Sequence, residues 1–240
     1  MGASARSSLL QEKASANLNR ACAKDSNGLR FYNMNTKFAA LLLASVGLAS
    51  QAGAESLIDG DAEVGKTRSI TCAACHGPEG NSANPLWPNL AGQHAKYTVA
   101  QLKAFKEGQR ANALMTSQAM LLSDADMANL AVYYEGLTPA VQTVADASLV
   151  ARGEALYRGG SAENGVAACI ACHGPRGKGN PAAQYPSISG QHAAYTEKTL
   201  RDYASGERQS VAGNNVMNEL SAKLSDEDIK ALASYVQGLH

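Results

Sequence analysis

Two segments of the chain carry apolar residues at spacings of three and four, the pattern of a helix with one buried face. Each segment opens with a capping-box sequence, SDAD at 123–126 and SDED at 225–228, with Asp where Glu or Gln is usual. Each ends at a glycine, Gly136 or Gly238, which is a common helix stop. The apolar positions are Met127, Leu130, Ala131 and Tyr134 in the first segment, and Ile229, Leu232, Ala233 and Val236 in the second.

Two further helices are expected, one from His94 to Gly108 and one from His192 to Gly206. No alternating apolar and polar run of useful length is present, so the pattern gives no support for a sheet. Abundant alanine and few aromatic residues also favour short, closely packed helices. The predicted fold class is therefore all-α.

These helices belong to two copies of one plan. CAACHGPEGN at 72–81 recurs as CIACHGPRGKGN at 169–180, and GQHAKYT at 92–98 recurs as GQHAAYT at 190–196. The second copy has about nine extra residues around 158–166, which we expect to form a surface loop. The sequence thus predicts one domain over 55–138 and another over 149–240, joined by a linker at 139–148.

Residues 34–54, MNTKFAALLLASVGLASQAGA, have the basic start, apolar run and small-residue cleavage site of a secretory signal peptide. A membrane anchor is the alternative, but the apolar run is short for a bilayer span. We expect cleavage near Ala54–Glu55 and export to the periplasm. Residues 1–33, which include Cys22, lie upstream of this signal and are expected to be no part of the fold.

Removal of residues 1–54 changes the charge of the chain. The full chain has 21 basic and 21 acidic residues, and the mature part keeps fifteen and nineteen of them, a net charge of −4. A mildly acidic protein without a basic stripe is a poor ligand for nucleic acid.

The apolar content of each copy is low for its size. Each has fewer than a hundred residues and few large apolar side chains, so neither is expected to be stably folded by its own core alone. We therefore expect a bulky apolar group in the centre of each copy.

The C-x-x-C-H spacing identifies that group as c-type haem. Two thiols three positions apart on a helical turn reach the two vinyl groups on one porphyrin edge, and the next residue, histidine, lies under the iron. Cys72, Cys75 and His76 form the first such motif, and Cys169, Cys172 and His173 form the second. Disulfides fit an exported chain, but they do not explain the histidines. A zinc ribbon would need closer CxxC pairs, and a thioredoxin-like dithiol needs a βαβ setting.

The second iron ligand decides between an electron carrier and an enzyme. In the second copy the single methionine is Met217, seven residues before Leu224, and the matching residue before Leu122 is Met115. Met120 remains an alternative ligand, whereas Met127 fits the apolar face of its helix. His94 and His192 are rival ligands, although a place at the solvent edge, near a haem propionate, is the more ordinary interpretation.

The matching loops WPNLAG and YPSISG place Pro88 and Pro186 where a backbone carbonyl could accept the second N–H of each motif histidine. The alternative is that each proline only stiffens its loop. The sequence alone leaves the two alternatives open.

Together the paired CxxCHG motifs, the proline loops, the GQHxxYT segments, the methionine before LSDxD and the final SYVQGLH resemble the dihaem cytochrome c4 family. The resemblance covers nearly all of 55–240. It implies two tandem class I cytochrome c domains related by a pseudo-twofold axis, with prolines that orient the proximal histidines. It implies thioether bonds at Cys72, Cys75, Cys169 and Cys172, and axial ligation by His76, Met115, His173 and Met217.

The resemblance also implies a function. It predicts a periplasmic one-electron carrier with two covalent haem c groups, not an enzyme, with a cytochrome bc-type donor, a haem–copper terminal oxidase as acceptor and peripheral membrane association. An electron-accepting dihaem subunit of a flavoprotein dehydrogenase is the main alternative. A dihaem peroxidase is a weaker one, because methionine in both copies argues against an open iron site.

Overall fold

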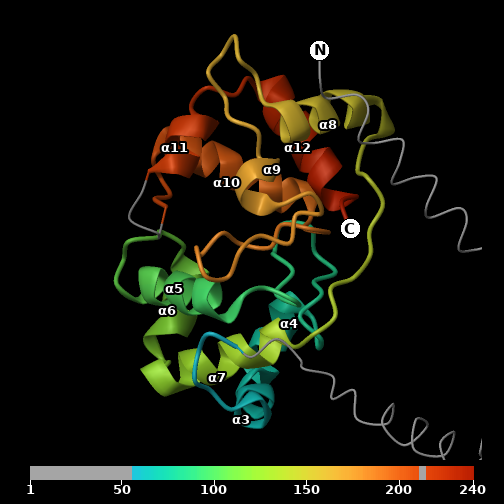
Figure 1. The fold of residues 1–240 in the computed structure, drawn as a ribbon. Helices are drawn as coiled ribbons and strands as arrows, with labels where there is room; N and C mark the ends of the chain where they lie inside the picture. The colour runs from blue at the N-terminus through green and yellow to red at the C-terminus, as the bar shows by residue number, and fades with distance from the viewer. Residues whose placement is uncertain (1–55, 211–214) are drawn as a thin grey trace, which may run out of the picture. The chain divides into compact units, whose positions relative to one another are not determined.

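Helices make up the regular secondary structure of the described residues, 56–210 and 215–240 of a computed structural model (Figure 1). Within these ranges only isolated bridges occur in place of strands, which confirms the all-α prediction. No helix there combines the length and hydropathy needed to cross a bilayer. The predicted signal peptide and residues 1–33 lie outside the described residues.

The first copy contains α3 (Ala62–Arg68), α4 (Ile70–His76), α5 (Ala95–Lys106), α6 (Ala113–Met120) and α7 (Asp124–Glu135).

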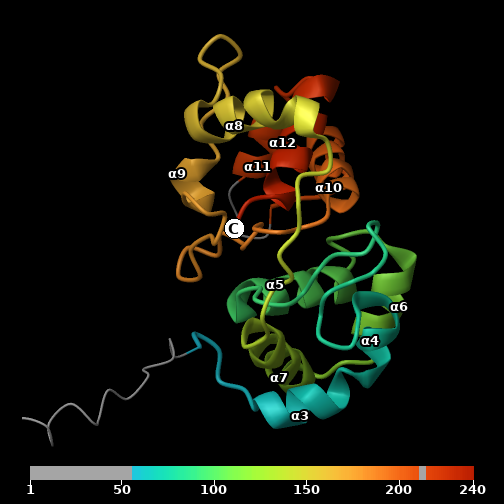
Figure 2. The same ribbon diagram turned by 90° about the vertical axis from the view of Figure 1, so that its right-hand side faces the viewer.

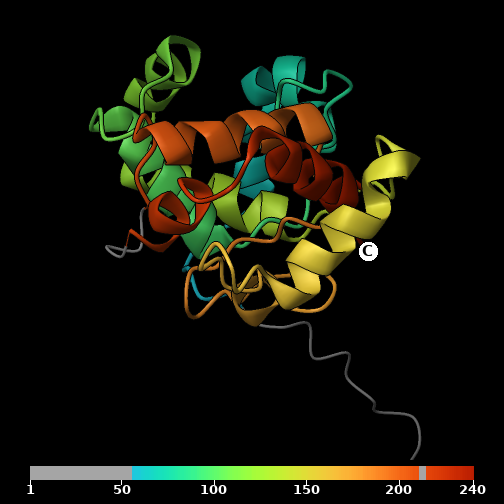
Figure 3. The same ribbon diagram turned by 90° about the horizontal axis from the view of Figure 1, so that it is seen from above.

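The second copy repeats this order after a short 3₁₀ turn, η1 (Ala147–Leu149). In the first copy α3 and α5 contact α7, and α5 also contacts α6; in the second, α8 and α10 contact α12, and α10 contacts α11. Figure 2 shows α3 beside α7 and α8 beside α12, and Figure 3 shows the orange α10 and dark red α12 from above. The helices of this copy are α8 (Val150–Gly159), α9 (Ile170–His173), α10 (Ala193–Ser205), α11 (Val216–Ser221) and α12 (Asp226–Gln237).

Both predicted capping boxes are present. The Ser123 and Ser225 side chains accept from the backbone of Asp126 and Asp228, whose carboxylates accept in return from the serine backbones. All eight apolar positions predicted on α7 and α12 are buried. The stop glycines differ from expectation in one respect: Gly136 and Gly238 have negative φ angles, so neither helix ends in the left-handed cap that usually selects glycine.

Glycine is required where helices cross. A Cβ atom on Gly65 of α3 would lie 2.0 Å from the Asn129 carbonyl oxygen of α7. At the matching crossing, a Cβ atom on Gly153 of α8 would lie 2.3 Å from the Ala231 oxygen of α12. The two backbones approach this closely only because these residues lack a side chain.

The insertion in the second copy is helical at its start. The sequence predicted a surface loop around 158–166, but α8 continues to Gly159, and the turn that follows is closed by paired hydrogen bonds between Ser161 and Val166. The helices enclose an apolar cluster made of Leu156, Tyr157, Leu200, Ile229, Leu232, Tyr235, Val236 and Leu239.

Candidate cofactor site

A cavity of about 630 Å³ brings the predicted site residues together. Its apolar lining supports the expectation that a bulky apolar group completes the core. Met115 and Met217 line it, whereas Met120 is 58% exposed and Met127 is fully buried, and neither of those two lines it. The lining also includes Cys72, Cys75, His76, Cys169, Cys172 and His173.

A short helix presents each C-x-x-C-H motif. In α4, Cys72 and Cys75 are three residues apart, so both thiols lie on one face of the helix. His76 is the last residue of this helix. The second motif runs from Cys169, the N-cap of α9, to His173. Gly77 and Gly174 then stop the helices with φ angles of 80° and 75°, a conformation that favours glycine. The chain therefore leaves the motif directly after the histidine.

The surroundings of the cysteines argue against a disulfide and against a reactive dithiol. Cys72, Cys75, Cys169 and Cys172 form no disulfide bond within the described residues. Burial raises the pKa of Cys169 to about 11, so its thiol holds its proton at neutral pH. A zinc ligand or a reactive dithiol requires the thiolate, which this burial disfavours. Within the described ranges no three His, Cys, Asp or Glu side chains form a metal cluster of their own.

Each motif histidine is oriented by a proline carbonyl. His76 Nδ1 lies 2.9 Å from the Pro88 oxygen and His173 Nδ1 lies 3.0 Å from the Pro186 oxygen. A carbonyl only accepts, so Nδ1 donates and the Nε2 lone pair is free for a metal. Of the two interpretations that the sequence left open, the structure shows the hydrogen-bond acceptor.

Burial keeps both imidazoles neutral. It lowers the pKa of His76 and of His173, and the hydrogen bond to the proline carbonyl opposes this shift only in part. A neutral imidazole with a free Nε2 is the form that binds iron.

Backbone hydrogen bonds hold the proline loops in place. The Gly80 oxygen accepts from Leu90 N at 2.7 Å and from Ala91 N at 3.0 Å. In the second copy the Gly177 oxygen accepts from Ile188 N at 2.7 Å and from Ser189 N at 3.1 Å. These contacts fix the loop two and three residues beyond each proline.

Asparagine side chains hold the segments that carry the two methionines. Asn112 caps α6 by accepting from Met115 N at 3.0 Å. Asn218, next to Met217, donates to the Tyr203 oxygen at 2.9 Å and to the Arg208 oxygen at 2.7 Å, which fastens α11 to the end of α10.

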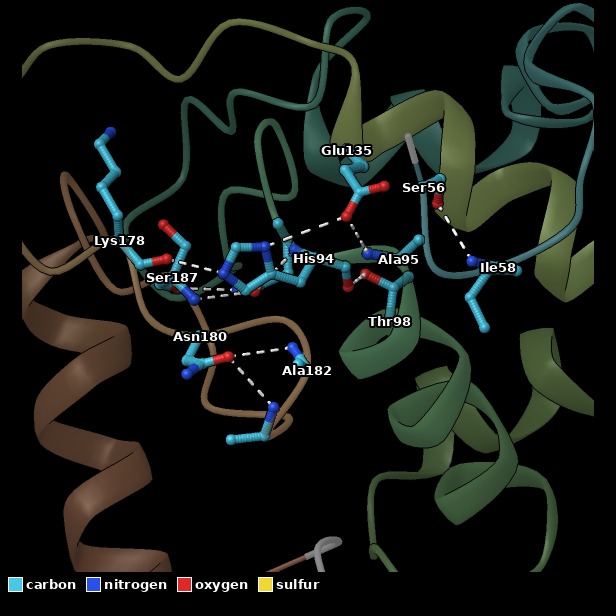
Figure 4. Close-up of polar contacts among 12 residues, drawn as sticks. Ser56, Ile58, His94, Ala95, Thr98, Glu135, Lys178, Asn180, Ala182 and Ser187 are labelled. Carbon is cyan, nitrogen blue, oxygen red and sulfur yellow. Dashed lines mark hydrogen bonds and ion pairs between the residues drawn. The ribbon is translucent and has the colours of Figure 1, made fainter. Parts of the chain in front are cut away.

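His94 and His192 contact the opposite copy of the repeat instead of the cavity. His94 Nε2 lies 2.7 Å from the Lys178 oxygen, and His192 Nε2 lies 2.8 Å from the Ser82 oxygen. Figure 4 shows the His94 ring between the Lys178 carbonyl and Glu135, whose carboxylate is 3.9 Å from Nδ1. His192 is buried, so the expected solvent-edge position is wrong for it. Neither histidine lines the cavity.

Sequence analysis missed a pair of arginines in the cavity wall, Arg110 and Arg208. Arg110 donates to Tyr195 Oη at 3.0 Å and Arg208 donates to Tyr97 Oη at 2.6 Å, so each arginine bonds a tyrosine of the other copy. Both also donate to Gln101 Oε1, at 2.6 and 3.0 Å. Their matching places, GQR at 108–110 and GER at 206–208, were a signal available in the sequence.

This arginine pair has the properties of a carboxylate site. Across residues 56–210 and 215–240 the arginines in ion pairs are other ones, Arg68, Arg152, Arg158 and Arg201. Arg208 Nε and Gln101 Nε2 are buried donors without a partner in the described chain, and both residues line the cavity. Burial raises the pKa of Tyr195, but Arg110 and Arg208 outweigh it and lower that pKa to about 7. The carboxylates of a porphyrin would fit this excess of positive charge.

Comparison with known proteins agrees with this geometry. The cytochrome c family model matches residues 62–138 and again residues 150–240. Cytochrome c4 of Azotobacter vinelandii is 44% identical over 209 residues, which cover 83% of this chain and 96% of the relative. The thiosulfate dehydrogenase electron acceptor of Thiomonas intermedia is 35% identical over 170 residues, covering 69% of this chain and 77% of the relative.

A solved structure shows the same fold. The crystal structure of reduced recombinant cytochrome c4 from Pseudomonas stutzeri matches with a TM-score of 0.73 and 42% sequence identity. The match covers 76% of this chain and 100% of that one.

Proposed function

Since the chain belongs to the cytochrome c4 family of electron carriers, with two covalently bound haem c groups, we propose that it works in the periplasm. We propose that it donates electrons there to a haem–copper terminal oxidase. The observation that most supports a carrier with two haems is the cavity, which both C-x-x-C-H motifs and one methionine from each copy line together. A cytochrome bc-type complex is the proposed donor. The proposed mature chain follows a leader at 34–54 and has domains at 55–138 and 149–240 with a linker at 139–148.

Each copy holds its haem with four side chains. Cys72 and Cys75, like Cys169 and Cys172, form thioether bonds, and His76 and His173 are the proximal ligands. Met115 and Met217 are the distal ligands, supported by their place in the cavity wall. The bound iron supplies one-electron cycling between Fe(III) and Fe(II).

The protein's residues keep the iron sites closed. Nδ1 donation to Pro88 and Pro186 holds each imidazole in one tautomer and orientation. Met115 and Met217 would close the iron sites to substrate, which suits electron transfer better than catalysis. Arg110, Arg208 and Gln101 bind the porphyrin carboxylates and offset their charge.

A redox titration with visible spectra on protein purified from the periplasm tests the ligand assignment. We expect two haems per chain, two midpoints, a far-red sulfur–iron band from both sites and no rapid binding of carbon monoxide to the reduced protein. One haem per chain, or fast carbon monoxide binding at one iron, would contradict it.

The proposed acceptor needs its own measurement. Reduced protein should be oxidised by membranes that contain a haem–copper oxidase, and this oxidation should stop with cyanide. Oxidation that is insensitive to cyanide would remove the oxidase from the proposal while leaving the haem sites intact.

A second candidate function is that of electron acceptor for a sulfur-compound dehydrogenase. The relative from Thiomonas intermedia, named as such an acceptor, favours it. Rapid reduction of this protein by a purified thiosulfate or flavoprotein dehydrogenase, with no reduction by a bc-type complex, would favour this candidate over the first.

A further inference from the structure

We propose that Gln93 and Gln191 are positioning residues that act crosswise, each fixing the proximal histidine of the opposite copy. This inference rests on the proposed ligand roles of His76 and His173. It assigns a function to the GQH sequences, whose histidines do not reach the cavity.

The Gln93 amide clamps one residue of the second copy. Gln93 Oε1 accepts from Ser187 N at 3.0 Å, and Gln93 Nε2 donates to the Ser187 oxygen at 2.8 Å. Ser187 directly follows Pro186, so its N–H and the Pro186 carbonyl belong to one planar peptide group. That carbonyl accepts from His173 Nδ1 at 3.0 Å. The hydrogen bonds therefore form a continuous chain from Gln93 through one peptide to His173.

The reciprocal chain runs in the other direction. Gln191 Oε1 accepts from Asn89 N at 2.9 Å, and Gln191 Nε2 donates to the Asn89 oxygen at 3.0 Å. Asn89 follows Pro88, whose carbonyl accepts from His76 Nδ1 at 2.9 Å. The same two-bond clamp thus occurs twice, with distances that agree within 0.2 Å in every matched pair.

The clamp does more than hold the loop, because hydrogen bonds at the two ends of a peptide reinforce each other. An acceptor on the N–H draws electron density toward the carbonyl oxygen, which then accepts more strongly from the histidine. A histidine that donates more strongly is a more basic ligand and stabilises Fe(III). Each glutamine therefore lowers the midpoint potential of the haem in the opposite copy.

The residues around the clamp fit this assignment. Both glutamines line the cavity and are half-buried, so water competes little for their amides. Each Oε1 also accepts from the next backbone N–H, that of His94 at 3.0 Å or His192 at 3.1 Å, which fixes the amide orientation. The carboxamide is thus held before the opposite loop binds it.

The test uses Gln93→Met and Gln191→Met in the full dihaem protein, since methionine keeps the length and removes both hydrogen bonds. In the reduced, diamagnetic protein the Nδ1 proton of each proximal histidine gives its own NMR signal. We expect Gln93→Met to speed solvent exchange of the His173 proton about tenfold, the factor for roughly one net hydrogen bond, and to leave the His76 proton unchanged. Gln191→Met should do the reverse. In each variant one of the two midpoints should rise.

Two controls separate positioning from a general loosening between the copies. His94→Ala removes a neighbouring contact to the opposite copy, at Lys178, but leaves Ser187 untouched, so both histidine protons should keep their exchange rates. Gln93→Glu keeps the acceptor for Ser187 N and loses only the donor, so its His173 proton should exchange nearly as slowly as in the parent. If Gln93→Met does not fold, Gln191→Met still tests the crossed effect, because the reciprocal clamp at Asn89 is made by a separate amide.

The crossed pattern is what the proposal requires. Faster exchange in the glutamine's own copy, equal changes in both copies, or no change would overturn it. If the parent protein contains only one haem or shows no sulfur–iron band, the proposed ligand set is wrong. Failure of the ligand set is therefore distinguishable from failure of the crosswise glutamine effect.

Discussion

His76 and His173 show how the contacts of single atoms select the nitrogen that is proposed to bind iron. Burial lowers the pKa of each imidazole and a proline carbonyl accepts a hydrogen bond from Nδ1, so the nitrogen with the free lone pair is Nε2. The proposed ligand residue types followed from the C-x-x-C-H spacing. Whether each proline carbonyl accepts a hydrogen bond or each proline only stiffens its loop could not be decided until the loop geometry was known. At this scale, local sequence was enough to propose the iron ligands, whereas the group that orients each histidine required the geometry of the proline loop.

The distal methionines give a test at the level of one side chain. Met217→Ala should remove about half of the far-red sulfur–iron band, open one iron to carbon monoxide and lower one midpoint, because a thioether favours Fe(II). Absorption spectra and a redox titration measure these changes. Met120→Ala is the matched control, since that side chain is 58% exposed and outside the cavity, and its spectrum should match the parent.

Asp126 gives a test of pH dependence. Hydrogen bonds from the Ser123 backbone and hydroxyl, helped by Arg68, hold the Asp126 pKa below its ordinary value of 3.8. The folded state thus binds this proton less readily than the unfolded state. The contribution to stability is complete above pH 3.8 and is lost as the pH falls through the lower, folded pKa.

Asp126→Asn should therefore be less stable than the parent at pH 7, and the difference should shrink as the pH falls below 3.8. Urea unfolding from pH 7 to pH 3 measures it. A difference that stays constant over this range would show that the charge of Asp126 contributes nothing.

Helix α8 shows what sequence pattern captures at the scale of elements and what it leaves out. The long helices α5, α7, α10 and α12 were predicted because periodic apolar faces and caps are local signals. The end of α8 was assigned to a loop because glycine and polar residues follow it, but the helix continues to Gly159 through the exposed Arg158, which donates to Glu154 one turn earlier. The end of a helix is the part of the element that local sequence pattern places least accurately.

The helix crossing at Gly153 gives a prediction of stability. Gly153→Ala should lower the free energy of unfolding by about 1–3 kcal/mol, because the added Cβ atom would lie 2.3 Å from the Ala231 oxygen. Gly159→Ala, in the same helix with nothing within 4 Å, should be neutral or stabilise by about 0.5 kcal/mol. Thermal unfolding of the two variants compares them, and equal stabilities would contradict the proposed close approach.

At the scale of the whole molecule, the contacts that join the copies could not be predicted. A repeat reveals two similar units, but it does not say which residue of one touches which residue of the other. Gln93, Gln191, Arg110 and Arg208 had visible counterparts in the sequence, yet their partners lie in the opposite copy. Such pairings depend on tertiary geometry and not on spacing along the chain.

The arginine pair gives a prediction at this scale. Arg208→Gln removes a buried positive charge, so the oxidised haems gain relative stability and the midpoints at pH 7 should fall. The pKa of the porphyrin carboxylates should rise, which makes the midpoints climb again as the pH is lowered. Redox titrations between pH 5 and pH 8 measure both effects.

Two further variants complete that comparison. Arg208→Lys keeps the charge and should retain most of the parent midpoint. Arg158→Gln removes an exposed arginine paired with Glu154 and should shift the midpoints little, because solvent screens that charge. Equal shifts for Arg208→Gln and Arg158→Gln would contradict the carboxylate site.

The amide clamps at Ser187 and Asn89 bear on attempts to study this protein in pieces. If the polypeptide were divided within 139–148 and each fragment loaded with haem, each fragment would have its own iron ligands but not the carboxamide that tunes them. The spectra and potentials of two such fragments would not add up to those of the intact chain. Titrations of single-haem fragments would therefore give reference values for a different electronic environment.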